Sequence, residues 1–155
     1  MKGEYDYYGA SGVIDHVNGY LFDKSLLLIG EDGANLINRS TPIAFFAHGK
    51  YWVNNHAHVI DAHSHELLLW IEKFINAIDL KPYVTGTAQP KMNQTKLNSI
   101  CVPLPPSPEQ KRIVAKIDQL TSMCGILEKH IDAARETQSA LLNAMMAQYG
   151  GERCA

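Results

Sequence analysis

Apolar residues recur at alternating spacings of four and three through the last third of the chain, from residue 113 to residue 145. This alternation is the heptad pattern of a coiled-coil helix, in which the a and d positions form one apolar stripe. With the four-residue steps taken as d to a, the a positions are Ile117, Cys124, Ile131, Gln138 and Met145, and the d positions are Ile113, Leu120, Leu127, Ala134 and Leu141. Isoleucine at a with leucine at d favours a two-stranded coil.

Local signals predict both ends of this helix. Ser107 followed by Gln110 predicts a capping box, and Pro108 suits the first helical position because proline has no N–H to leave unpaired there. The pair Gly150-Gly151 predicts the end of the helix. A helix over residues 108–149 would be roughly 60 Å long at about 1.5 Å per residue.

A helix of this length cannot be buried by one small domain. The stripe holds seven large apolar side chains. Covering each contributes about 1.5 to 3 kcal/mol, so an uncovered stripe would forfeit roughly 10 to 20 kcal/mol. We therefore expect a partner helix, since the chain contains no second sustained heptad. The alternative is a long helix that lies along its own domain.

Before residue 107 the pattern changes to short apolar runs separated by turn residues. Aromatic and β-branched residues on both sides of a glycine-rich turn at residues 9–12 predict two strands joined by that turn. Further strands are expected over residues 26–29, 43–46, 51–60 and 99–104. Ser64 is expected to cap a core-packing helix, in which the apolar positions are Leu67, Trp70, Ile71, Phe74, Ile75 and Ile78.

These elements predict an α+β fold. Residues 1–106 would form a small mixed, β-rich domain, residues 107–149 one long coiled-coil-forming α-helix, and residues 150–155 a tail.

Charge changes this picture little. The chain has 155 residues, of which 46% are hydrophobic and 19% charged, and its formal net charge is only −2 at pH 7. A protein that grips DNA unaided is usually basic, because phosphate neutralisation supplies most non-specific affinity. Charge therefore does not predict nucleic-acid binding. If DNA is the ligand, another subunit is expected to supply much of the positive surface.

Three cysteines, Cys101, Cys124 and Cys154, are widely spaced and include no C-x-x-C pair, so neither a disulfide framework nor a zinc knuckle is indicated. The longest apolar runs are about five residues, against the 18 or more that a membrane span needs. The first four residues precede no apolar segment of a signal peptide. We expect a protein of the reducing cytoplasm.

Four histidines, His56, His58, His63 and His65, lie close together along the chain. Alternation along the expected strand over residues 51–60 puts His56 and His58 on one face. A zinc-dependent protein is therefore one alternative, although no carboxylate recurs at a fixed ligand spacing. Structural histidines are the commoner outcome, and we predict neither a metal site nor another cofactor.

Two short motifs resemble catalytic or phosphate-binding signatures but depart from them. The run G-A-S-G at residues 9–12 is not G-x-S-x-G, and no strand-to-helix elbow follows Ser11. The glycine-rich run at residues 30–34 lacks the Lys and Ser/Thr of a phosphate loop, and its two acids would repel phosphate. We predict no catalytic residue.

Residues 86–97 form the most informative polar stretch. Between Lys81 and Glu109 the chain contains Lys91 and Lys96 and no acidic residue. Amides and lysines on a loop are the groups that meet base edges and phosphates. By composition alone, the alternative is a solvated surface turn.

Five segments in a fixed order carry a family resemblance. They read YYGASGVID (7–15), LLIGEDGANL (27–36), GKYWVNNHAHVI (49–60), GTAQPKMNQTKLNSICVPLPP (86–106) and EQKRIVAKID (109–118). Together they resemble the specificity subunit of Type I restriction-modification enzymes over nearly the whole chain. No single segment would suffice.

The resemblance implies an architecture and a role. In that family each half of the subunit is a target recognition domain followed by a conserved helix, and the two halves read the two parts of a split DNA site. The helices pack antiparallel as a spacer between the domains. The subunit does no chemistry; methyltransferase subunits and, in full complexes, restriction subunits assemble on it.

This chain departs from the family pattern in two ways. It has one domain and one helix, which implies a half-subunit or a fragment that pairs with itself, and we expect an antiparallel homodimer through residues 113–145. Its domain also begins late, without the segment that normally precedes the YYGASG motif. That departure favours an alternative, a truncated assembly module that does not itself read DNA.

The expected partners are thus double-stranded DNA, methyltransferase subunits and a second copy of the chain. The candidate DNA contacts are Lys91, Asn93, Gln94 and Lys96, with Lys50 and Arg39 from turns between strands as secondary candidates. Amide side chains can read adenine bidentately, and lysines mainly hold phosphate.

Overall fold

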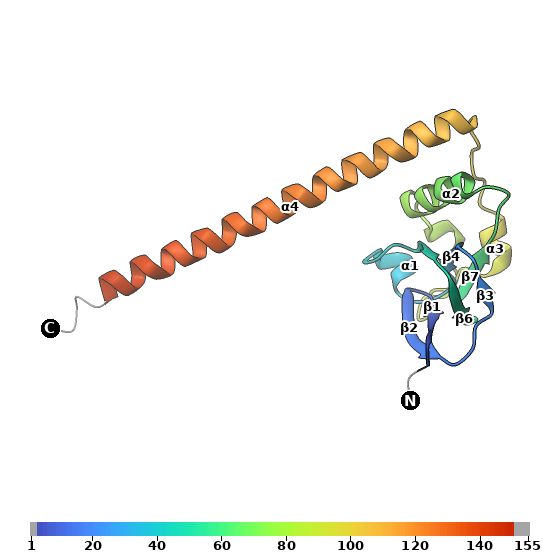
Figure 1. The fold of residues 1–155 in the computed structure, drawn as a ribbon, viewed down its shortest axis with the longest axis horizontal. Coiled ribbons are helices and arrows are strands. Elements are labelled where there is room, and N and C mark those ends of the chain that lie inside the picture. The colour runs from blue at the N-terminus through green and yellow to red at the C-terminus, as the bar shows by residue number, and fades with distance from the viewer. Residues whose placement is uncertain (1–2, 151–155) are drawn as a thin grey trace. The chain divides into compact units, whose positions relative to one another are not determined.

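The structure is a computed structural model that describes residues 3–150, with side chains described for residues 3–148. The chain forms two compact units, Met1–Val114 and Ala115–Ala155. The predicted tail beyond residue 150, which includes Cys154, lies outside the described residues. Figure 1 shows the strands and short helices of the first unit and the long helix α4.

The first sheet has four strands in the order β2-β1-β6-β3. Their bounds are Tyr5–Gly9 (β1), Gly12–Val17 (β2), Phe22–Asp23 (β3) and Lys50–Val53 (β6). β1 pairs antiparallel with β2 and parallel with β6, while β3 pairs antiparallel with β6. Gly12 carries a φ of +120° just after the β1–β2 turn, a backbone conformation that favours glycine. The predicted strand–turn–strand at the start of the chain is confirmed.

The second sheet has three strands in the order β5-β4-β7, and both outer strands run antiparallel to β4. Their bounds are Leu26–Gly30 (β4), Ala44–Ala47 (β5) and Ala57–Ile60 (β7). Every residue of β4 is buried because apolar clusters lie on both of its faces. Leu27 and Ile29 belong to one cluster and Leu28 to the other, which explains the unbroken apolar run of this strand.

The single strand predicted over residues 51–60 is wrong. The chain instead breaks after Val53, so that β6 and β7 belong to different sheets. The Asn54 side chain accepts a hydrogen bond of 2.8 Å from the backbone N–H of His56, which makes a local turn that competes with the strand. The alternation itself holds within β6, where Tyr51 and Val53 are buried and Trp52 is exposed.

The predicted core helix is α2, His65–Ala77, and its cap is confirmed. Ser64 lies in the extended conformation and accepts a hydrogen bond of 3.2 Å from the N–H of Leu67. Leu68 and Ile75 of this helix are buried in the cluster that also holds Leu27 and Ile29 of β4. Three short helices complete the unit: α1 (Asn35–Asn38), the 3-10 helix η1 (Lys81–Tyr83) and α3 (Gln94–Asn98).

Asn76 joins α2 to the second sheet. Its Oδ1 accepts hydrogen bonds from the N–H groups of Ile43 and Ala44, at 2.9 and 3.0 Å. Its Nδ2 donates to the carbonyl of Ala44 at 2.8 Å. One partly buried side chain therefore satisfies three backbone groups at the start of β5.

The strand predicted over residues 99–104 does not form. Pro103, Pro105 and Pro106 cannot donate to a ladder, which leaves the segment without strand pairing. The segment is instead held by the indole of Trp70, whose Nε1 donates to the carbonyl of Pro103 at 2.8 Å.

The long helix is confirmed as α4, Ser107–Gly150, which has 44 residues and would be roughly 66 Å long at about 1.5 Å per residue. The predicted capping box is wrong, because the backbone N–H of Gln110 donates to the carbonyl of Pro106 and its side chain donates to Pro105. Ser107 is the first helical residue. Among the helices that the structure describes, none combines the length and apolar character that a membrane span requires.

The first two turns of α4 belong to the globular unit. Val114 is buried there, Ile113 is partly buried, and Lys111 Nζ lies 3.3 Å from a carboxylate oxygen of Glu66 on α2. Ile113 is thus the one heptad position that packs within the domain.

The rest of the predicted stripe is exposed. The exposed fraction of its large apolar side chains runs from 36% at Ile117 to 62% at Leu141. Cys124, Ala134 and Gln138 of the same stripe are also exposed. An apolar surface of this regularity is what a partner helix would cover.

Replacing Asn76 with alanine is expected to lower the free energy of unfolding by about 2 kcal/mol, because three backbone groups lose their partner. Urea titration followed by circular dichroism measures this loss. Asn98→Ala, at an exposed position of α3, is the matched control and is expected to stay within about 0.5 kcal/mol of the wild type. Equal losses in the two variants would contradict the role assigned to Asn76.

Candidate nucleic-acid interface

The predicted polar stretch begins with a closed turn. The backbones of Thr85 and Lys91 exchange two hydrogen bonds, of 2.9 and 2.8 Å, and Thr85 Oγ1 adds a third to the Lys91 carbonyl at 3.2 Å. Gly86 has a φ of +82°, and a Cβ there would lie 2.5 Å from the carbonyl oxygen of Gln89. This turn therefore requires glycine at position 86.

The stretch is anchored to the chain that follows β4. The N–H of Met92 donates to the carbonyl of Glu31 at 2.7 Å, and the N–H of Gly33 donates to the carbonyl of Pro90 at 3.0 Å. The Met92 side chain is fully buried. Residues 85–89 remain exposed, so the stretch has a fixed base and an exposed tip.

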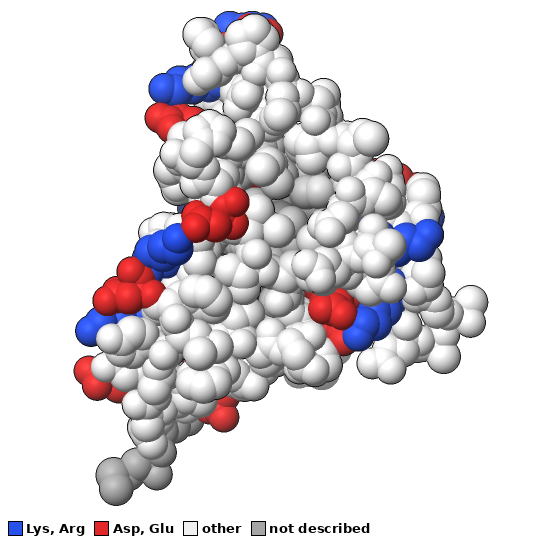
Figure 2. All heavy atoms as spheres, turned by 90° about the vertical axis from the view of Figure 1, so that its right-hand side faces the viewer, with Lys and Arg blue, Asp and Glu red and all other residues white. Residues whose placement is uncertain are grey.

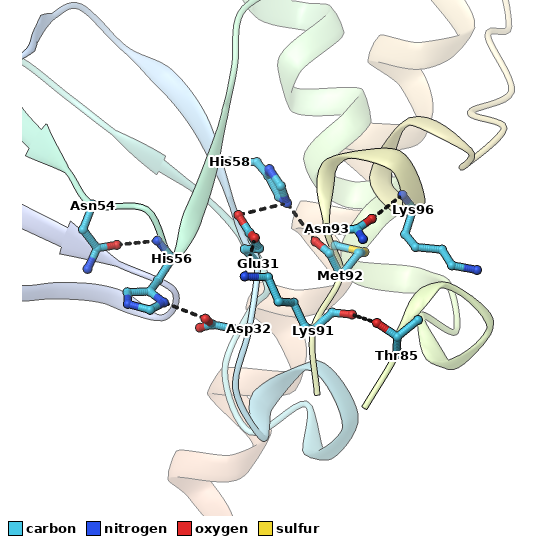
Figure 3. A network of polar contacts seen from close by, with 10 residues as sticks. All are labelled: Glu31, Asp32, Asn54, His56, His58, Thr85, Lys91, Met92, Asn93 and Lys96. Atoms are coloured by element: carbon cyan, nitrogen blue, oxygen red, sulfur yellow. Dashed lines mark hydrogen bonds and ion pairs between the residues drawn. The ribbon is translucent and has the colours of Figure 1, made fainter. Parts of the chain in front are cut away.

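Asn93 connects this anchor to α3. Its side chain accepts a hydrogen bond of 3.0 Å from the N–H of Lys96, which makes Asn93 the N-cap of the helix. Gln94 is exposed at the start of α3. Among the residues that the structure describes, no acidic side chain pairs with Lys96, and Figure 3 shows its ammonium group directed away from the neighbouring contacts. Gln94 is thus exposed to a ligand, and Lys96 is partly buried but has no acidic partner among the described residues.

Lys91 is paired with an acid of its own chain. Its Nζ lies 3.0 Å from Glu31 Oε1. The hydrogen bond to Glu31, followed by the charge of that residue, raises the pKa of the Lys91 ammonium group. Figure 3 shows Lys91 reaching across to Glu31.

Two histidines complete this network. His58 Nε2 donates to the carbonyl of Met92 at 2.8 Å and lies 3.8 Å from Glu31 Oε2. His56 Nδ1 lies 2.6 Å from a carboxylate oxygen of Asp32. Both rings therefore hold the chain around Glu31 and Asp32 in place (Figure 3).

These contacts do not assemble a metal site. His65 packs against the ring of Phe46, with centroids 5.1 Å apart, and takes no part in the network around His56 and His58. Within residues 3–148, no group of three or more His, Cys, Asp or Glu side chains is placed to hold a metal ion. The zinc alternative therefore gains no support.

The two secondary DNA candidates lie elsewhere. Lys50 begins β6 in the first sheet, and its Nζ lies 4.9 Å from the centroid of the Tyr20 ring. Arg39 has a positive φ of 53° and donates through one guanidinium nitrogen to the carbonyls of Ile75, Asn76 and Ile78, at 3.1, 3.1 and 2.8 Å. Arg39 thus satisfies carbonyls at the C-terminus of α2, which is a structural role.

The structure brings together Lys91, Asn93, Gln94 and Lys96 in one continuous stretch. Glu31 and Asp32 help to hold this stretch, but in the sequence they could be interpreted only as acids that would repel phosphate. The pattern of charges along the sequence could not reveal the ion pair between Lys91 and Glu31, because about 60 residues separate them. Figure 2 shows acidic and basic side chains interspersed on the visible face, without a broad basic patch.

The family described as "Type I restriction modification DNA specificity domain" matches residues 1–135 of the chain. A putative type I restriction enzyme specificity subunit of Haemophilus influenzae is 34% identical over 124 residues, which are 79% of this chain and 31% of that protein. The EcoDI specificity subunit of Escherichia coli is 37% identical over 70 residues, which are 44% of this chain and 16% of that protein.

A solved structure has the same fold. The Type I restriction-modification S subunit from M. genitalium superposes with a TM-score of 0.51 at 14% sequence identity, over 96% of this chain and 41% of that chain. The chain spans about a third of the length of the Haemophilus influenzae relative. The α+β fold with a long C-terminal helix is confirmed, and none of these findings favours the assembly-only alternative.

Arg39→Gln is expected to lower the free energy of unfolding by about 2 kcal/mol, because three carbonyls lose a charged donor. Urea titration measures the change. Lys96→Gln is the control and is expected to stay within about 0.5 kcal/mol of the wild type, because Lys96 is only partly buried and glutamine keeps most of its aliphatic side chain. An Arg39→Gln variant as stable as the wild type would overturn the structural role of Arg39.

Proposed function

Because this chain belongs to the family of Type I restriction-modification DNA specificity domains, we propose that it reads one part of a split DNA target and directs a methyltransferase to it. In this proposal residues 1–106 form the recognition domain and residues 107–149 the spacer helix. The chain has no catalytic role of its own. It works beside methyltransferase subunits, and in full complexes restriction subunits, in the cytoplasm, where the DNA substrate lies.

The observation that carries the DNA-reading role is the anchored stretch around α3. Buried Met92 and the cap at Asn93 hold the start of α3 in one geometry, while Gln94 is exposed and the partly buried Lys96 has no acidic partner among the described residues. A fixed amide can make the paired hydrogen bonds that recognise adenine, and a lysine can hold a phosphate beside it. Rigid presentation favours recognition because less side-chain and backbone freedom is lost on binding.

Modest charge fits a subunit that acts within a complex. The net charge is −2, and Lys91 already has an acidic partner, so phosphate attraction by this chain alone is weak. Partner subunits would supply the remaining positive surface. The specificity chain would then contribute contacts to bases more than general affinity.

The exposed stripe of α4 supports pairing of two copies. Burying the stripe from Ile117 to Met145 against a second copy removes large apolar side chains from water. Antiparallel packing places the two recognition domains at opposite ends of the pair. Gln138, in the seam, would fix the register at some cost in stability.

Methylation mapping tests the reading role. The chain is co-expressed with a methyltransferase subunit, and methylated adenines are mapped; a symmetric pair is expected to give a palindromic split motif. Gln94→Ala is expected to relax one position of the motif, because the lost base contact is worth about 1 to 3 kcal/mol, whereas Lys96→Gln lowers methylation at all sites alike.

The control for this mapping is Lys129→Gln, on the outer face of α4, which is expected to leave both the motif and the extent of methylation unchanged. A motif that neither the Gln94 nor the Lys96 variant alters would show that α3 does not contact DNA. Absence of any sequence-specific methylation would refute the reading role itself.

Pairing is tested by Leu120→Glu with Leu127→Glu, which put two charges in the seam. Light scattering is expected to show the mass of one chain for this variant and of two chains for the wild type. Ser122→Glu with Ser139→Glu adds the same charge at positions outside the seam and is expected to remain dimeric. A seam variant that stays dimeric would contradict pairing through α4.

A further inference from the structure

The ion pair between Lys91 and Glu31 lies within the surface proposed to meet DNA. The two charged atoms are 3.0 Å apart, and the side chain of Lys91 is 50% exposed while that of Glu31 is 18% exposed. The lysine is therefore accessible to a ligand, whereas the carboxylate is largely enclosed by the protein. This asymmetry means that the lysine can change partners while the acid stays in place.

Glu31 is held by both of its backbone groups. Its N–H donates to the carbonyl of His56 at 2.9 Å, and its carbonyl accepts from the N–H of Met92 at 2.7 Å. His58 Nε2 lies 3.8 Å from its second carboxylate oxygen. The backbone of Glu31 is thus held in place, and its carboxylate lies between Lys91 and His58.

A DNA phosphate and the Glu31 carboxylate present the same chemistry to Lys91, an anionic oxygen that accepts from the ammonium group. The two anions also repel one another, so the lysine cannot serve both well. Resting on the proposed function, we propose that Glu31 is an affinity-determining residue that sets how much Lys91 contributes to DNA binding. It competes with DNA phosphate for the Lys91 ammonium group, so that Lys91 must give up the ion pair to make a phosphate contact.

The strength of the Lys91–Glu31 ion pair suits this role. An exposed ion pair is weak, so a well-placed phosphate displaces it, yet it is strong enough to lower affinity for random DNA about two- to fivefold. Removing the carboxylate gives Lys91 one additional phosphate contact on random DNA. The slope of log affinity against log salt then becomes steeper by about 0.9.

Lys96 provides an internal comparison, because no acid pairs with it among the described residues. In the wild type, Lys96→Gln is expected to weaken binding to random DNA, whereas Lys91→Gln has little effect there. In the Glu31→Gln background, Lys91→Gln is expected to remove the gained affinity. The effects at residues 31 and 91 are therefore non-additive.

The chain also offers a control that is matched in charge. Lys24 and Asp61 form a second lysine–carboxylate pair, and Asp61 follows the last residue of β7, whereas the DNA-facing network lies around the start of that strand. Asp61→Asn and Glu31→Gln change the net charge by the same amount. A difference in DNA affinity between the two variants therefore reflects where the carboxylate lies and not the change in net charge.

The experiment measures fluorescence anisotropy of a random duplex and of the mapped target duplex, over a series of salt concentrations, with the chain assembled with its methyltransferase. Glu31→Gln is expected to bind the random duplex about two- to fivefold more tightly and to gain at least as much on the target, because Lys91 no longer gives up the ion pair on either duplex. Asp61→Asn is expected to leave both affinities unchanged. Glu31→Asp, which shortens the side chain, keeps the carboxylate but lengthens the pair, and is expected to lie between wild type and Glu31→Gln.

Equal effects of Glu31→Gln and Asp61→Asn on affinity would overturn the proposal. It would also be overturned if neither Glu31→Gln nor Glu31→Asp raised the affinity for the random duplex. If Lys91→Gln still weakens target binding in that case, the proposed function stands without this refinement. If neither Lys91→Gln nor Lys96→Gln weakens target binding, the DNA contacts themselves are wrong and the proposal fails with them.

Discussion

The central strand β4 is the constraint on which the globular unit depends. Its side chains alternate between two apolar clusters, and it pairs with a strand on each side, so no part of it can face water. Gly30, at its end, lies so close to the first sheet that a Cβ would come within 2.5 Å of the Ala10 carbonyl oxygen. The chain that leaves this rigid strand carries Glu31 and Asp32, and residues 90–92 are hydrogen-bonded there.

Sequence patterns predicted the helices and strands that are determined by residues close together in the sequence. The strand–turn–strand at the start, the buried run of β4, the Ser64 cap and the long helix each follow from spacing or from one capping side chain. Predictions failed where a nearby polar group or a distant contact decided the outcome. Asn54 made a turn in the middle of an expected strand, and the Trp70 indole fixed residues that had been expected to form another.

The candidate site divides in the same way. A run of amides and lysines without acids was visible in the sequence, and Figure 3 shows Lys91, Asn93 and Lys96 around the start of α3. Which of these lysines is free was not visible, because pairing with Glu31 depends on how β4 meets a turn far along the chain. Arg39 shows the same limit: a turn arginine looks available until the carbonyls at the end of α2 are known.

The low net charge of the chain and the exposed apolar stripe of α4 can be explained together. A single domain on a chain of net charge −2 would gain little from phosphates, so a half-site bound by one domain alone would be held weakly. Joining two such domains by a stiff pair of helices makes the second encounter intramolecular, and affinity rises without any new contact to DNA. The gain depends on spacing, because only sites separated by the length of the spacer allow both domains to bind. In such a protein the distance between the two domains, which the paired helices set, would determine both the affinity for DNA and the choice of target.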